Sequence, residues 1–204
     1  MMVRFLIIGL LLPTLAWAQT DDAGKTAKSG NLSVLSEKSL EHFSVSGEFR
    51  VTFPSGCGKI VTKVPVEGDG EMDGLPAVRV SITYCDRHQG VGEGCSVTSY
   101  FNVTNKDGGY PEPEQTVERV VRSLKSMNVV IKKEVSLRKE LPDGTVIEGV
   151  DVFAAEASGS GQAWVRGLLY EGDIYIMSAW KSTGDLWGNP DFIDFFNSFK
   201  PGVK

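Results

Sequence analysis

A two-residue alternation of apolar and polar side chains constrains the fold of this chain more than any other feature of its sequence. Residues 49–53 read Phe-Arg-Val-Thr-Phe, and the same period returns in residues 78–84. Because successive side chains of a β-strand point to opposite faces of a sheet, this period predicts strands that bury one face. Further strands are predicted over residues 60–66, 95–103, 129–138, 146–155, 163–170 and 173–181.

Short turns separate the later strands of this series. Proline presets φ and glycine accepts a positive φ, so residues 142–144, Pro-Asp-Gly, predict a turn. Strands joined by connections this short pair antiparallel. Residues 163–170 carry apolar side chains on both faces of the predicted strand. Such a strand needs cover on both sides, and helices are the available cover.

Two amphipathic segments predict helices. Pro113 and the acids beside it suit a first helical turn, and apolar residues recur every three or four positions from Val117 to Met127. Asn189 and Pro190 mark the start of a second helix. The predicted class is therefore α+β: a mostly antiparallel sheet of about eight strands flanked by two helices, an α-β-α sandwich. Residues 41–204 form this single domain.

The first eighteen residues are typical of a secretory signal peptide. Arg4 precedes an apolar run over residues 5–12, and Ala-Trp-Ala at residues 16–18 predicts cleavage before Gln19. The apolar run is too short to span a bilayer, so no stable membrane insertion is expected after cleavage. Residues 19–40 are polar and predict a flexible tail. The protein is thus expected to be exported, periplasmic or secreted, and the style of the leader is that of a bacterial envelope protein.

Composition excludes several classes of protein. The chain has 204 residues, of which 41% are hydrophobic and 23% charged, and its net charge is −5. These fractions are those of a folded globular protein rather than a largely disordered or multi-pass membrane chain. A nucleic-acid partner is not expected, because binding to phosphates needs a basic surface.

The order of the predicted elements and two short motifs carry a resemblance to a known family. Residues 49–54, Phe-Arg-Val-Thr-Phe-Pro, and residues 195–201, Phe-Phe-Asn-Ser-Phe-Lys-Pro, frame a mid-chain helix and two late hairpins. This arrangement resembles the PsbP-like superfamily over roughly residues 43–200. The superfamily includes extrinsic photosystem proteins, a nuclear Ran-binding factor and small secreted bacterial proteins. The resemblance implies an α-β-α sandwich and a non-catalytic binding or accessory role, and it transfers no site residue.

Three cysteines, Cys57, Cys85 and Cys95, carry the most informative chemistry of the chain. An exported chain meets an oxidising compartment, so we expect one disulfide and one remaining thiol. Cys85 ends one predicted strand and Cys95 begins its neighbour, which favours a Cys85–Cys95 disulfide across one hairpin. Cys57 lies in a turn at the same end of the sheet and is the alternative partner. The remaining cysteine is a candidate for intermolecular pairing.

A zinc site is the alternative interpretation of this segment. Cys85 and His88 have Cys-x-x-His spacing, and with Cys57 and Cys95 they make a Cys₃His ligand set. Thiolates are hard to keep reduced after export, so a disulfide with an exposed loop histidine is favoured over zinc. No metal ion and no other cofactor is expected.

The sequence predicts no catalytic site. His42 and His88 are the only histidines, and no G-x-S-x-G nucleophile motif is present. The segment 158–161, Ser-Gly-Ser-Gly, lacks the lysine and following helix of a phosphate-binding loop and predicts a hairpin turn. The protein is therefore not expected to be an enzyme.

Three functions remain as hypotheses. The leading one is a non-catalytic envelope protein that binds a protein partner as an accessory or scaffold factor. The second is a carrier of a small molecule or lipid, with its pocket between sheet and helix. The third is a thiol or zinc site at Cys57, Cys85, His88 and Cys95. Candidate binding residues are Arg87 and His88 in the glycine-rich loop, and Trp187, which is expected to be exposed.

Overall fold

The computed structural model of the protein describes residues 40–44, 49–55, 57, 59–63, 70–72, 75–77, 79–86, 93–101, 103, 109, 112–125, 129–141 and 144–202. The predicted leader, residues 1–18, lies outside these residues. So does the predicted tail, residues 19–40, except for its last residue. Among the described residues, no helix is both long and apolar enough to cross a membrane.

Seven antiparallel strands form the larger sheet, which we call the main sheet. Its spatial order is β3-β6-β7-β11-β10-β9-β8. Most neighbours in this order are joined by short connections, as expected for antiparallel pairing. The strand bounds are β3 Lys59–Lys63, β6 Arg79–Asp86, β7 Glu93–Phe101, β8 Val129–Glu140, β9 Val146–Glu156, β10 Gln162–Tyr170 and β11 Asp173–Lys181.

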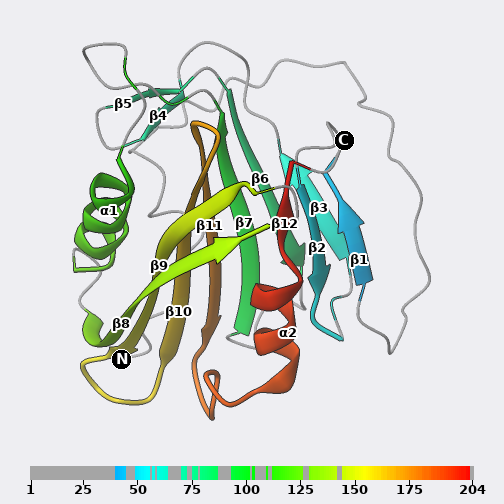
Figure 1. The fold of residues 1–204 in the computed structure, drawn as a ribbon. Helices are drawn as coiled ribbons and strands as arrows, with labels where there is room; N and C mark the ends of the chain where they lie inside the picture. The colour runs from blue at the N-terminus through cyan, green and yellow to red at the C-terminus, as the bar shows by residue number, and fades with distance from the viewer. Residues whose placement is uncertain are drawn as a thin grey trace, which may run out of the picture.

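A second sheet of three strands, the small sheet, joins the two ends of the domain. It consists of β1 (Leu40–Phe43), β2 (Phe49–Phe53) and β12 (Lys200–Pro201), with β2 in the centre. A separate hairpin pairs β4 (Gly70–Met72) with β5 (Leu75–Ala77). In Figure 1 the blue strands of the small sheet and the red β12 lie together beside the main sheet.

Each face of the main sheet has its own hydrophobic core. On one face, α1 (Pro113–Lys125) packs Val120, Val121 and Leu124 against valines of β9 and β10. On the other face, α2 (Pro190–Ser198) and the small sheet pack their phenylalanines against β7, β10 and β11. This two-sided cover agrees with β10, whose Trp164 and Val165 enter different cores.

The predicted α+β class is wrong, because the described part of the protein is predominantly β. It contains a seven-stranded and a three-stranded sheet and only two helices. The sequence predicted that the C-terminal helix alone would cover one face of the main sheet. The small sheet covers it together with α2, so the architecture is a β-rich sandwich. The α-β-α sandwich implied by the resemblance is therefore also replaced by a β-rich sandwich of two sheets with two helices in the described residues.

Local patterns predicted most individual elements. In β2, Phe49, Val51 and Phe53 are buried and alternate with two half-buried polar residues, which confirms the two-residue period. The second helix begins as predicted, since the Asn189 side chain accepts a hydrogen bond of 3.0 Å from the backbone N–H of Asp191. The helix ends at Ser198, because the following residues extend into β12 and pair with β2.

Candidate functional site

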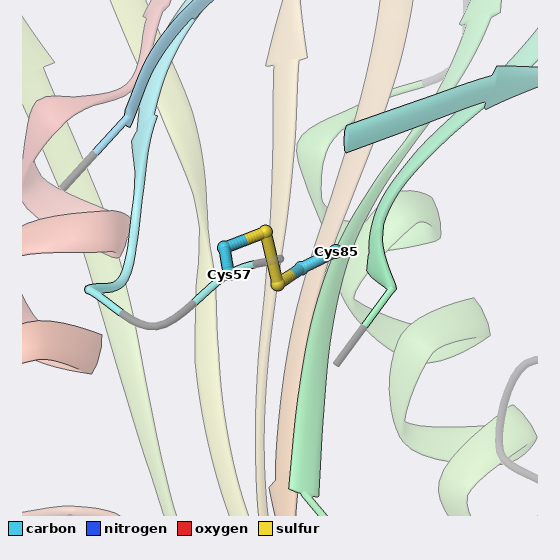
Figure 2. Close-up of a disulfide and its surroundings, with 2 residues drawn as sticks. All are labelled: Cys57 and Cys85. Atoms are coloured by element: carbon cyan, nitrogen blue, oxygen red, sulfur yellow. A yellow bond between two sulfur atoms is a disulfide. The ribbon is translucent and has the colours of Figure 1, made fainter. Parts of the chain in front are cut away.

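Two of the three cysteines form a disulfide between the main sheet and the chain that leaves β2. Cys57 lies in the connection from β2 to β3, and Cys85 lies near the end of β6. Their Cα atoms are 5.5 Å apart, and 28 positions separate them in the sequence. Figure 2 shows the bond linking this connection to β6. The disulfide therefore ties the small sheet covalently to the main sheet.

The predicted pairing of Cys85 with Cys95 is wrong, and the alternative partner, Cys57, holds the bond. The reason is the departure of β2 from the main sheet. Since β2 packs over the main sheet, the turn that follows it lies above β6 rather than beyond the sheet edge. The Cys57 N–H donates to the Pro54 carbonyl at 3.2 Å, which closes this turn and directs Cys57 toward Cys85.

Cys95 lies on β7, the strand next to β6 in the main sheet, and keeps its thiol. The β6–β7 register pairs Tyr84 with Ser96, so its continuation by one residue places Cys95 opposite Cys85. Both side chains belong to the same hydrophobic core, which shows that they point to the same face of the sheet. We call Cys57, Cys85 and Cys95 the cysteine cluster.

The cysteine cluster is not arranged as a zinc site in this structure. Among the described residues, no group of three or more His, Cys, Asp or Glu side chains is placed to hold a metal ion. The disulfide also occupies two sulfur atoms that zinc would require as thiolates. The remaining candidates of this segment, Arg87 and His88, lie outside the described residues.

Trp187 does not form the exposed aromatic surface expected from the sequence. The side chain is half-buried, and its indole N–H donates to the Ala163 carbonyl at 3.1 Å. Its ring meets Phe153 edge to face, with ring centroids 5.9 Å apart. Trp187 therefore anchors the loop before α2 to the main sheet through its packed ring and its hydrogen-bonded N–H.

A buried ion pair, which the sequence patterns did not reveal, connects the main sheet to α2. Arg166 donates to the two carboxylate oxygens of Asp151 through Nε at 2.7 Å and Nη2 at 2.8 Å. Trp164 donates to the same carboxylate at 2.9 Å, and Arg166 Nη1 donates to the Phe196 carbonyl at 2.7 Å. This carbonyl lies in the last turns of α2, where a cation is favourable.

The sequence does contain a signal for this ion pair. A hairpin centred on residues 158–159 places Asp151 of β9 opposite Arg166 of β10, which is the register observed. The predicted turn, residues 158–161, is centred one residue further along and would pair Asp151 with Leu168, which is why the ion pair was not predicted. With each nitrogen of the Arg166 guanidinium and both carboxylate oxygens of Asp151 hydrogen-bonded, the pair is suited to hold α2 in place rather than to act on a ligand.

The inner face of the small sheet contains a histidine in an apolar setting. His42 on β1 lies between the rings of Phe49 and Phe53, with centroid distances of 6.1 and 6.0 Å. Its Nε2 atom is buried and has no hydrogen-bond partner within the described part of the chain. Burial lowers the pKa of His42 below its ordinary value of 6.5. Burial therefore favours the neutral form of the imidazole.

One of the two edges of the main sheet is formed by a long strand, β8. β8 has twelve residues and pairs with β9, and no other described strand lies beside it. Half of the backbone N–H and C=O groups of an edge strand point away from its single neighbour and can pair with an added strand. Val130 of β8 is 45% exposed, and it is the only large hydrophobic residue of the described chain that is exposed to this degree.

No protein-family model matches the chain, and no curated protein matches it.

Proposed function

We propose that the protein is an exported, non-catalytic accessory factor that binds another protein along the edge strand β8. The observation that carries the proposal is the length and exposure of this strand. Ordinary strands are about five or six residues long, whereas β8 has twelve. Edge strands are commonly kept short or covered to prevent pairing with other chains. A long edge that also exposes Val130 is a suitable place for strand addition by a partner.

The charge of β8 supports a partner of a particular chemistry. The strand carries four basic and two acidic residues, whereas the whole chain has a net charge of −5. Two copies of this basic edge would repel each other, which disfavours self-association through β8. An acidic, extended segment of a different protein would instead be attracted. We infer that such a segment is the partner.

The leader pattern and the disulfide support export. Residues 1–18 have the features of a signal peptide, and disulfides persist chiefly in oxidising compartments outside the cytosol. The hydrogen bonds of the Asp151–Arg166 ion pair and the hydrogen bond that anchors Trp187 support a structural rather than a catalytic use of these polar groups.

A charge-reversal experiment tests the proposal. The double variant Lys132→Glu/Lys139→Glu changes the charge of β8 by the same amount as the control variant Arg122→Glu/Lys200→Glu changes that of α1 and β12. All four side chains are exposed. The protein is returned to its own cells, and the size of the native species in the exported fraction is measured by native electrophoresis.

The wild type and the control are expected to migrate as a complex larger than the monomer, and the β8 variant as the monomer. Reversing two charges that face an acidic segment should weaken binding by about tenfold or more. A wild type that migrates only as a monomer, or a complex that survives the β8 reversal, would contradict the proposal.

A further inference from the structure

We propose that Cys85 exchanges its disulfide partner between Cys57 and Cys95, so that the cysteine cluster is a thiol–disulfide switch. In one state the disulfide ties the β2–β3 connection to the main sheet. In the other it joins β6 to β7 within the main sheet and releases this connection. The switch is independent of binding at β8.

The strand register supplies the alternative partner. Cys85 lies between Ile60 of β3 on one side and the position of Cys95 on the other, along one row of the main sheet. Cys57 approaches the same sulfur from above the sheet, through the turn after β2. Cys85 can thus pair with either Cys57 or Cys95, and the cysteine that it does not pair with keeps its thiol.

The observed backbone spacing suits the Cys57–Cys85 pair, and the spacing general to opposite residues of antiparallel strands suits the Cys85–Cys95 pair. The Cα atoms of Cys57 and Cys85 are 5.5 Å apart in the observed disulfide. Directly opposite residues of antiparallel strands have Cα atoms about 4.5 or 5.5 Å apart. Both spacings fall within the range of roughly 4.4–6.8 Å that disulfides require. Exchange therefore needs a movement of side chains and of the turn, but no new strand pairing.

Burial favours exchange inside the cluster over exchange with thiols from solution. Cys57, Cys85 and Cys95 are 2%, 4% and 1% exposed. Dissolved thiols reach such sulfur atoms slowly, whereas Cys95 belongs to the same hydrophobic core as the disulfide and lies on the strand next to β6. Holding two reacting groups together in this way raises their effective concentration greatly.

The chemical step is a thiol–disulfide exchange without net oxidation. Cys95 gives up its proton to water, and its thiolate attacks the Sγ atom of Cys85. A Cys85–Cys95 bond forms, the Cys57–Cys85 bond breaks, and the electron pair of the broken bond leaves on Cys57. The Cys57 thiolate then takes up a proton. The count of one disulfide and one thiol is unchanged.

Alkylation mapping of the purified, oxidised protein tests the switch. The protein is incubated at pH 8.5 without added thiol, samples are acidified at intervals, and thiols are alkylated in acidic denaturant. Peptide mass analysis then shows which cysteine carries the label. We expect the label on Cys95 at first, and then on Cys57 until a constant fraction is reached. The rate should be independent of protein concentration and rise with pH, because the thiolate is the nucleophile.

Two single variants provide a matched second readout. The Cys57→Ser variant is expected to form a monomeric Cys85–Cys95 disulfide on oxidation. The Cys85→Ser variant is expected to keep two thiols, because it lacks the cysteine common to both pairs. A label that stays on Cys95 alone in the wild type overturns the switch. So does a Cys57→Ser variant that keeps two thiols or forms only disulfide-linked dimers.

Discussion

At the scale of single residues, the Asp151–Arg166 pair is the buried polar contact with the largest expected effect on stability. The two side chains are 7% and 12% exposed, and their hydrogen bonds join β9, β10 and the end of α2. Removing one partner of such a pair leaves an uncompensated charge in a desolvated site. The cost is therefore larger than for a pair on the surface.

We predict that Arg166→Ala lowers the free energy of unfolding by about 3–5 kcal/mol. Arg138→Ala provides the control, because Arg138 pairs with Glu148 while remaining 73% exposed. Its loss should cost about 0–1 kcal/mol. Urea denaturation of both variants measures the difference. Equal losses for the two arginines would contradict the structural role assigned to Asp151 and Arg166.

His42 makes the stability of the protein depend on pH. Burial lowers the pKa of His42 in the folded state below 6.5, so the unfolded chain binds this proton more readily. The contribution of the neutral imidazole is thus fully present above pH 6.5 and is lost as the pH falls through the lowered pKa. Acidification should therefore destabilise the wild type.

The measurement compares the unfolding midpoints of wild type and His42→Leu at pH 7.5 and 5.0. The wild type is expected to lose more stability on acidification than the variant, which has no imidazole to protonate. Carboxylates titrate in both proteins, so the difference between their losses of stability gives the contribution of His42. An equal loss in both would show that His42 does not carry this dependence.

At the scale of elements, the capping of α2 is a local feature that matters to the whole core. Asn189 accepts a hydrogen bond from the N–H of Asp191, and the helix buries Phe192, Phe195 and Phe196. We predict that Asn189→Ala lowers the free energy of unfolding by about 1 kcal/mol, whereas Asn189→Asp, which keeps the cap, costs little. Thermal unfolding of both variants measures this, and equal losses would exclude the cap as the cause.

The elements themselves were largely predictable from the sequence, whereas their assembly was not. Alternation located β2 and β6, short turns delimited β9–β11, and the apolar stripe located α1, because these patterns follow from local geometry. The pairing of β12 with β2 joins residues about 150 positions apart, for which no local pattern exists. This pairing removes β2 from the main sheet and creates the second sheet.

The absence of a local pattern for long-range packing also explains why the cysteine pairing was predicted wrongly. The sequence located all three cysteines near one end of the sheet, and they do form one cluster. It could not select between Cys57 and Cys95 as partner of Cys85, because that choice depends on where β2 packs. Trp187 was misjudged for a similar reason, since Phe153 and the Ala163 carbonyl come from distant strands.

At the scale of the whole molecule, export is a prediction of the leader pattern. Protein recovered from outside the cytosol of its own cells should begin at Gln19, and its intact mass should lack residues 1–18 and two hydrogens. The Ala18→Trp variant should retain the leader, because cleavage needs a small residue at this position. Recovery of the wild type with residues 1–18 intact would contradict processing at this site.

The central claim is that β8 is the binding edge of the molecule, and site-specific photocrosslinking in the native cells tests it most directly. A photoreactive residue is placed at Val130 or Ser136 on β8 and, as a control, at the exposed Glu118 on α1. We predict a crosslinked adduct of one defined mass from both β8 positions and none from α1. An adduct from α1 alone, or no adduct from β8, would contradict the account.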